Sequence, residues 1–503
     1  MTARYMTGRL YAALSYNVAA VKWYTKAAEQ ECPEAQYELG VCYEAGDGVG
    51  KDEAKAAELY RKAAGQSYAE AQKKLGDCYT HGTGVAKDLE QAFECYSKAA
   101  KQGNARAQNN LGVCYTNGEG VVEDPAQAAE WYKRAAEQGL AQAQCRLGDF
   151  YEYGEGVTKD LVKAAEWYRK AAEQGNAGAQ YKLGKCYYYG KGTEMNNNEA
   201  VKWLRRASEQ GAADAQDLLG DCYYYGYGVE MNHWEAVKWY EKAAKKGNAD
   251  AQCSLGYCHE SGRGVEKDLA KAAEWYRKSA EQGWARAQCN LGYFYENGRG
   301  VEKDLAKAVE WYRKSAEQGW AWAQYNLGRC YHKEQGVARD LKKAMEWYLK
   351  AAEQGWADAQ YIVGEFYSHG YGGIKVNNAE ALKWYYKAAE QGVAEAQFIL
   401  GLDYKRGEGG VKKDFAKGVE WYRKAAEQGH MYALYNLAVS YEYGEGVPKD
   451  KETAIKLYQK AAEQGCTDAE KDVKRLEGGG LGSAVAASAA LGGAALLWKI
   501  LRG

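Results

Sequence analysis

The sequence predicts an all-α fold: a right-handed solenoid of about twelve helix-pair repeats, each 36 residues long, with no sheet. The first observation is a period, because an Ala-Gln pair recurs every 36 residues from Gln36 to Gln360. The second is that each interval contains two helical patterns, and the second pattern has capping residues at both ends. A fixed period of this length is typical of repeat architectures, and 503 residues are too many for one ordinary globular core. The period slips by one residue at Gln397 and again where Leu434 replaces the glutamine.

The first helix of each copy follows the pattern AxAQxxLGxCYxxG. Ala323, Leu327 and Tyr331 show its apolar stripe, because residues four apart lie on one helix face. Gly328, beside that leucine, is expected to let a neighbouring helix approach closely. A glycine turn of the form GxGV, as at Gly154 and Gly156, then leads to the second helix.

The second helix follows the pattern DxxKAxEWYRKAAEQG. An aspartate marks its start, since the carboxylate can accept hydrogen bonds from free backbone N–H groups of the first turn. These aspartates are Asp88, Asp124, Asp160, Asp268, Asp304, Asp340, Asp414 and Asp450. Glycine marks its end, as at Gly319 and Gly355.

Such a helix pair cannot bury its apolar face alone, whereas stacking on the next copy can. We therefore expect one continuous solenoid over residues 17–477, with twelve complete pairs. Residues 1–16 lack a full first-helix pattern and are expected to form an irregular or partial cap. Residues 478–503 form a Gly/Ala-rich hydrophobic tail.

The composition argues against several classes of protein. Lys and Arg number 67 against 68 Asp and Glu, so nothing favours nucleic acid as a partner. Seven of the 13 cysteines occupy one repeated first-helix position, where they cannot pair within their own copy. Buried cysteine behaves as a small apolar residue, so we expect unbridged thiols, and the opening residues do not resemble a signal peptide. These observations favour a cytoplasmic protein.

No motif indicates catalysis, a cofactor or a metal. The GxG pairs lack a third glycine and recur in nearly every copy, which is typical of turns rather than of nucleotide sites. The six histidines lie in different copies. Cys253, Cys258 and His259 come nearest to a metal-ligand cluster, yet Cys258 is a repeated core position, so we interpret them as packing residues. We expect a protein that is not an enzyme and uses no cofactor.

The words AQxxLGxxYxxGxGVxxDxxKAxxWYxKAAEQG resemble the Sel-one-like repeat (SLR), a relative of the tetratricopeptide repeat, over about residues 17–476. The resemblance implies an α/α superhelix whose first helices line a concave face, and a role as an adaptor or scaffold. Leu434, Ala438 and Glu334 depart from the family's pattern.

The predicted partner site is an aromatic stretch across residues 257–361. Trp322 lies two residues before its repeated glutamine, at a position that is polar in most copies. By analogy with related repeats, this position faces the concave groove, as do the positions one and five residues after the glutamine. The predicted site residues are Trp322, Tyr325, Tyr361, Tyr257, Tyr293, Arg286 and Arg329. Exposed aromatic and arginine residues are enriched at binding hot spots, so we expect this surface to bind a peptide or helix of another protein.

Two alternatives stay open at the sequence level. Trp284, Trp320 and Trp356 occupy the entry to three consecutive first helices, where they could instead cover preceding helices as packing between copies. The tail 478–503 has no charge over the 21 residues from Gly478 to Trp498, about the length that crosses a bilayer. The protein would then be a tail-anchored membrane regulator or an accessory subunit of a membrane or quality-control complex.

Overall fold

A computed structural model of the chain describes residues 2–478. Over these residues the fold is helical and contains no strand, which confirms the predicted fold class. The chain forms two compact units, Met1–Asn248 and Ala249–Gly503.

The first unit contains fourteen helices in its described part. They are α1 (Thr2–Ala13), α2 (Asn17–Ala28), α3 (Pro33–Ala45), α4 (Glu53–Gly65), α5 (Ala69–His81), α6 (Leu89–Lys101), α7 (Ala105–Asn117), α8 (Pro125–Glu137), α9 (Ala141–Tyr153), α10 (Leu161–Glu173), α11 (Ala177–Tyr189), α12 (Asn197–Glu209), α13 (Ala213–Tyr225) and α14 (His233–Lys245).

The second unit continues the same alternation. Its described elements are α15 (Ala249–Ser261), α16 (Leu269–Glu281), α17 (Ala285–Asn297), α18 (Leu305–Glu317), α19 (Ala321–Lys333), α20 (Leu341–Glu353), α21 (Ala357–His369), the short 3-10 helix η1 (Tyr371–Gly373), α22 (Asn378–Glu390), α23 (Ala394–Arg406), α24 (Phe415–Glu427), α25 (Met431–Tyr443), α26 (Lys451–Glu463) and α27 (Thr467–Glu477).

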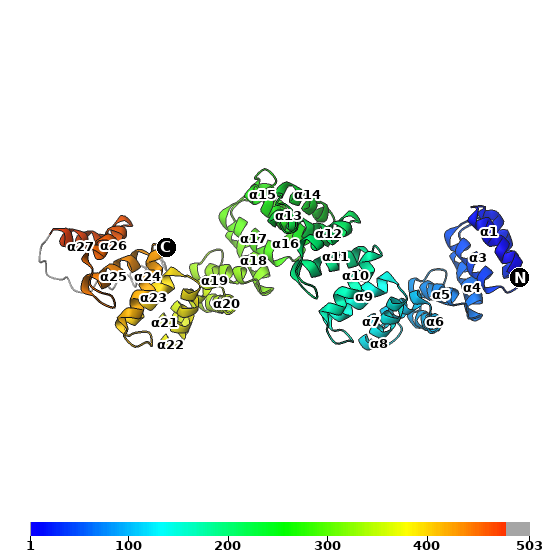
Figure 1. The fold of residues 1–503 in the computed structure, drawn as a ribbon, viewed down its shortest axis with the longest axis horizontal. Coiled ribbons are helices and arrows are strands. Elements are labelled where there is room, and N and C mark those ends of the chain that lie inside the picture. The colour runs from blue at the N-terminus through cyan, green and yellow to red at the C-terminus, as the bar shows by residue number, and fades with distance from the viewer. Residues whose placement is uncertain (1, 479–503) are drawn as a thin grey trace. The chain divides into compact units, whose positions relative to one another are not determined.

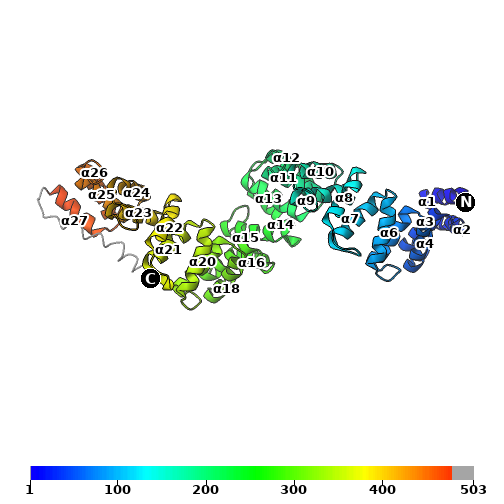
Figure 2. The same ribbon diagram turned by 90° about the horizontal axis from the view of Figure 1, so that it is seen from below.

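Odd-numbered helices are the first helices of the copies, and even-numbered helices are the second. Within each unit, every first helix packs against the second helix that follows it, and that helix packs against the next first helix (Figures 1 and 2). At the predicted N-terminal cap, helix α1 packs against α2, although it lacks the repeat pattern.

The capping residues act as the sequence predicts. Asp268 accepts a hydrogen bond from the backbone N–H of Lys271 at 3.0 Å, and the other predicted aspartates cap their helices in the same way. Helices α3 to α25 of the first-helix series end at a left-handed residue, which is glycine in all of them but α19. In α19 this residue is Glu334, with φ of 57°, a backbone conformation that favours glycine.

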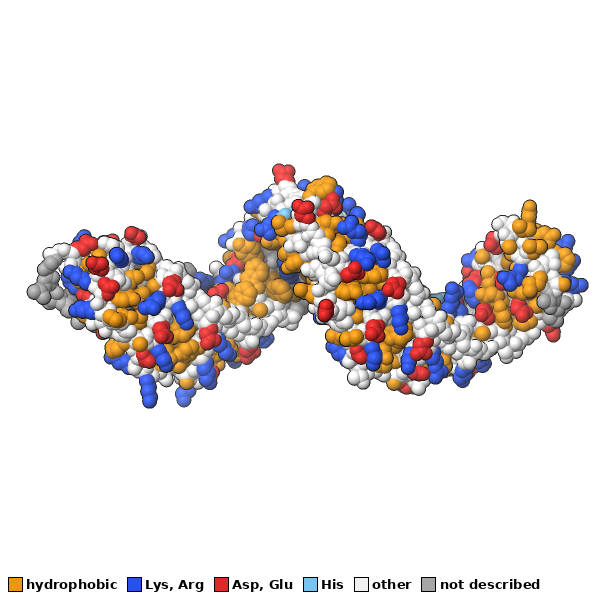
Figure 3. Space-filling view, viewed as in Figure 1, with side chains coloured by type: hydrophobic (Ala, Val, Ile, Leu, Met, Phe, Trp, Pro, Cys, Tyr) orange, Lys and Arg blue, Asp and Glu red, His pale blue; other side chains and the backbone are white. Residues whose placement is uncertain are grey.

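Charged side chains of both signs are interspersed on the surface. Figure 3 shows Lys and Arg next to Asp and Glu across the visible face, without a large area of one sign. This agrees with the near-zero net charge of −1. Within residues 2–478 no helix is both long and apolar enough to cross a membrane. The predicted hydrophobic tail lies outside the described residues from residue 479 onward.

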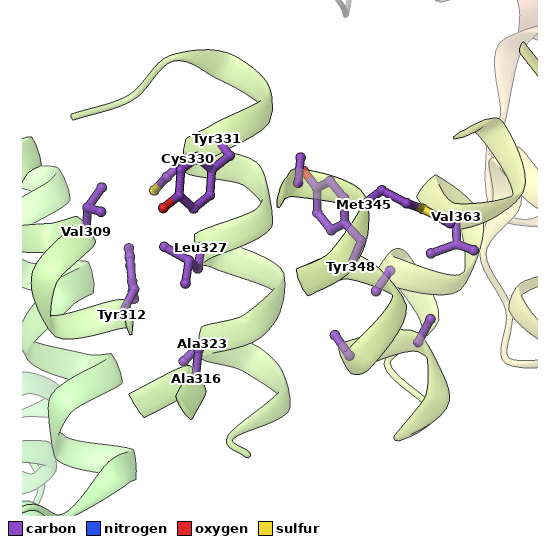
Figure 4. Close-up of a cluster of buried hydrophobic side chains, with 14 of the residues drawn as sticks. Val309, Tyr312, Ala316, Ala323, Leu327, Cys330, Tyr331, Met345, Tyr348 and Val363 are labelled. Carbon is purple, nitrogen blue, oxygen red and sulfur yellow. The ribbon is translucent and has the colours of Figure 1, made fainter. Parts of the chain in front are cut away.

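The core of most copies forms where a second-helix tyrosine lies on a first-helix glycine. A Cβ atom on Gly328 would lie 2.9 Å from Cδ1 of Tyr348, so glycine allows the close approach that the sequence predicts, and a side chain there would make the ring or the helix shift. Figure 4 shows Leu327 and Cys330 of α19 directed toward Tyr312 of α18. Because the glycine–tyrosine contact recurs in most copies, the helix pairs share one packing geometry.

A ladder of glutamine hydrogen bonds explains why Gln recurs every 36 residues. The amide of Gln324 donates to the carbonyl of Ala316, at the end of the preceding second helix, at 3.1 Å. The amide of Gln354, which caps the following second helix, donates to Oε1 of Gln324 at 2.7 Å. The same two bonds join Gln72 to its neighbours, and their equivalents recur through both units. Each buried glutamine thus joins three consecutive helices.

The ladder is interrupted in the first unit. Lys246 stands where other copies carry the donating glutamine, and its ammonium group bonds to the carbonyl of Gly211 instead. Oε1 of Gln216 is consequently buried with no hydrogen-bond partner among the described residues. A buried acceptor that receives no hydrogen bond destabilises the fold, because it has lost its bonds to water without replacing them.

Candidate partner-binding site

The predicted site lies on one face of the first helices of the second unit. Residues two before and five after the repeated glutamine are seven apart, or two helical turns, so they lie on the same side of a helix. We call the surface formed by these residues the shared face. It consists of Asp250 and Tyr257 (α15), Arg286 and Tyr293 (α17), Trp322 and Arg329 (α19), Asp358 and Glu365 (α21), and Glu395 and Leu402 (α23).

Trp322 and Tyr293 meet on the shared face, although they come from different copies. Their ring centroids are 5.9 Å apart, and both side chains are half-buried. The guanidinium of Arg299 lies 5.4 Å from the Tyr293 ring. The three side chains therefore form an aromatic surface that rests partly on the core and remains accessible to a partner.

Tyr325, also on α19, packs against other rings than this pair does. Its ring centroid is 5.7 Å from that of Tyr348 and 6.1 Å from that of Trp356. Burial raises the pKa of Tyr325, and its hydroxyl feels the opposite charges of Asp358 and Arg329. Nε1 of Trp356 is buried with no hydrogen-bond partner in the described part of the chain.

The three entry tryptophans differ in exposure. Trp356 packs against Tyr325 between copies, which agrees with the packing interpretation. Trp284 and Trp320 are each 39% exposed. Packing between copies therefore describes Trp356 better than it describes the other two.

Arg329 joins two copies. Its guanidinium is 2.6 Å from both carboxylate oxygens of Glu296. Glu296 also accepts a hydrogen bond from the hydroxyl of Tyr312, again at 2.6 Å. The Arg329 side chain is 29% exposed and that of Glu296 11% exposed, so this bond is largely buried. Arg329 thus ties first helix α19 to the preceding copy.

The remaining predicted residues lie around this centre. Tyr361 packs its ring 6.2 Å from that of Tyr385 within the core of its own copy, and burial raises its pKa. Tyr257 is 37% exposed. Arg286 is exposed, and its charge opposes the burial that raises the pKa of Asp250. The structure therefore brings Tyr293 and Trp322 together, whereas Tyr325 and Tyr361 pack against core tyrosines. Their role in binding stays a prediction.

Sequence reasoning missed two groups of residues. The carboxylates Asp358, Glu365 and Glu395 lie on the shared face beyond the aromatic residues, and their positions relative to the repeated glutamine could have revealed them. A second aromatic group lies in the first unit, where the word YYYG occurs twice. There the rings of Tyr225 and Tyr227 stack at 5.5 Å, and Tyr189 is 53% exposed.

Buried thiols and histidines do not form a further site in the described residues. All cysteines except Cys42 and Cys145 are buried. Burial raises the pKa of the Cys330 thiol to about 12, so it is a packing group rather than a nucleophile at neutral pH. Within residues 2–478 no three His, Cys, Asp or Glu side chains are grouped so that they could hold a metal ion.

Comparison with known proteins identifies the repeat. The Sel1 repeat matches the chain at thirteen segments, residues 17–32, 33–68, 69–104, 105–140, 141–176, 177–211, 213–248, 249–284, 285–320, 323–356, 357–393, 394–430 and 432–466. No curated protein gives a significant match to the chain.

Two solved structures from bacteria are similar to it. One is a protective antigen present in uropathogenic Escherichia coli strains, which displays an SLR fold. It has 38% sequence identity and a TM-score of 0.70, and the match covers 93% of this chain and 99% of that chain. The other is a Sel1 repeat protein from Oxalobacter formigenes, with 34% identity, a TM-score of 0.48, and coverage of 61% and 89% of the two chains. The thirteen repeat matches and the similarity to the Escherichia coli antigen agree with the repeat words and the helix pairs: the chain belongs to the Sel1 repeat family.

Proposed function

We propose that this protein is a non-enzymatic scaffold that binds a peptide or helix of a partner protein on the shared face of its second unit. Sel1 repeat proteins generally act as scaffolds for protein interactions. The proposal adds a location, centred on Trp322, Tyr293 and Tyr325, and a kind of ligand, a segment with an apolar or aromatic anchor.

The observation that carries this proposal is the placement of Trp322. Its position is polar in most copies, and its side chain is half-buried against Tyr293 rather than enclosed in a core. The part of the Trp322 ring that its contact with Tyr293 leaves exposed gives a partner a rigid surface to contact. The Arg329–Glu296 bond fixes neighbouring first helices relative to each other, which reduces the entropy lost on binding.

A random library of 15-residue peptides displayed on phage provides the test. The library is selected on the full chain and then screened on Trp322→Ala and on Trp311→Ala. Trp311 is the matched control, because it lies on second helix α18 with the ammonium group of Lys314 at 4.2 Å from its ring. The selected peptides should bind the Trp311→Ala variant normally and the Trp322→Ala variant about 30-fold more weakly, the equivalent of about 2 kcal/mol. Peptides that bind all three proteins equally would refute the site.

A further inference from the structure

Five of the described copies contain a partly buried chain of three side chains that joins them to the next copy. A second-helix tyrosine donates its hydroxyl hydrogen to a carboxylate of the preceding first helix, and a Lys or Arg of the next copy binds the same carboxylate. Tyr312, Glu296 and Arg329 form one such triad. The others that complete it in this way are Tyr60–Glu44–Lys74, Tyr168–Asp149–Lys182, Tyr276–Glu260–Arg299 and Tyr458–Glu442–Arg475.

Glu365 has the tyrosine but not the cation. The hydroxyl of Tyr385 donates to its Oε1 at 2.6 Å. Glu365 lies five residues after its glutamine, as Asp149 does. The next first helix, α23, carries Ile399 at the position from which Lys182 binds Asp149. Glu365 is 4% exposed, and its Oε2 has no hydrogen-bond partner among the described residues. The imidazole Nδ1 of His369 is 3.9 Å from Oε2, beyond hydrogen-bond distance.

Two further carboxylates adjoin Glu365 on the shared face. Asp358 lies two helical turns before it on α21, and Glu395 lies at the equivalent position of α23. The charge of Glu395 raises the pKa of Asp358, and the charges of Glu365 and Glu395 both raise the pKa of Tyr361. Within the described part of the chain, neither Asp358 nor Glu395 forms an ion pair with a Lys or Arg. Three carboxylates are thus gathered beside the aromatic residues with no Lys or Arg bound to them.

We propose that Asp358, Glu365 and Glu395 form a subsite for a cationic side chain of the bound partner. This inference rests on the proposed function and specifies the ligand further: the peptide carries an arginine or lysine at a fixed distance from its aromatic anchor. That side chain takes the place relative to Glu365 that Lys182 takes relative to Asp149. Arginine suits the position better than lysine, because its planar guanidinium binds a carboxylate through two parallel hydrogen bonds.

The arrangement also sets the direction of the ligand. Along the shared face, Arg286 precedes the aromatic centre and the three carboxylates follow it. A partner whose basic residue lies over Asp358 and Glu395 is held in one orientation, since the opposite orientation would place that residue near Arg286.

The same peptide library tests the subsite through the sequences that it yields. Peptides whose binding depends on Trp322 should share an Arg or Lys at one spacing from an aromatic residue. Replacing that residue by Ala in the peptide should weaken binding at least about tenfold on the native chain. On Glu365→Gln the same change in the peptide should have a much smaller effect. The glutamine in Glu365→Gln keeps an oxygen that can accept the hydrogen bond from the Tyr385 hydroxyl. The double variant Asp358→Asn, Glu395→Gln repeats the binding measurement with changes at exposed side chains only.

The outcomes separate the two proposals. The cation subsite is wrong if Trp322-dependent peptides carry no common basic residue. It is also wrong if replacing that residue by Ala weakens peptide binding equally on the native chain, on Glu365→Gln and on the double variant. In both cases the aromatic site stands. If no peptide depends on Trp322, the proposed function and the subsite fall together.

Discussion

Replacing Lys246 by glutamine should complete the hydrogen-bond ladder where it is interrupted. In the equivalent place of another copy, Gln102 donates to Oε1 of Gln72 at 2.7 Å, and the same bond would satisfy the buried Oε1 of Gln216. An unsatisfied buried acceptor costs about 1–3 kcal/mol. Losing a cation from the C-terminus of α14 costs about 0.3–1 kcal/mol. We therefore expect Lys246→Gln to stabilise this copy by about 1 kcal/mol.

Hydrogen exchange at the amides of α13 and α14 measures this gain locally. Repeat arrays unfold through neighbouring copies, so one global melting point would not isolate it. A gain of about 1 kcal/mol should slow exchange there about fivefold, with little change in distant copies. Lys245→Gln is the matched control, since the Lys245 side chain is 73% exposed and outside the ladder. Exchange that is unchanged or faster in Lys246→Gln would refute the role of the ladder.

Three further predictions follow from burial. Gly328→Ala should destabilise its copy by about 1–3 kcal/mol in denaturant titrations, because the new methyl group would overlap the ring of Tyr348. Gly178→Ala should be neutral or slightly stabilising, because its Cβ would come no closer than 3.4 Å to the side chain of Asn176. Burial and nearby cations lower the pKa of His332 from its usual 6.5 to about 4, so the unfolded chain takes up a proton first. Stability should fall as pH drops from 6.5 toward 4, and His332→Phe should weaken that dependence in thermal melts. All 13 cysteines should react with a thiol reagent in denaturant, while Cys330 should react slowly in the native protein; several bridges would contradict the expected unbridged thiols.

Much of the fold could be predicted from the sequence because its signals are local and repeated. The glutamine period, the aspartate caps and the glycine beside Leu327 each report a contact that recurs in copy after copy. Helix α1 could not be predicted in this way, since its sequence lacks the repeat pattern and its order comes from packing on α2.

The candidate site was predictable in position but not in its polar contacts. Trp322 was found because it departs from the pattern of its neighbours. The bond between Arg329 and Glu296 joins residues 33 apart, and their pairing depends on the offset between copies rather than on any local motif. The unpaired state of Glu365 was harder still to predict, because it depends on α23 having no Lys or Arg at the position that would bind it.

The affinity of one selected peptide for three forms of the chain tests the central claim most directly. Titration calorimetry would compare the native chain, Trp322→Ala and Trp311→Ala, with a thermal melt of each protein. The account predicts about 30-fold weaker binding for Trp322→Ala, native affinity for Trp311→Ala, and similar melting of all three. Native affinity of Trp322→Ala together with a much lower melting temperature would show that Trp322 is a core residue, and would contradict the claim.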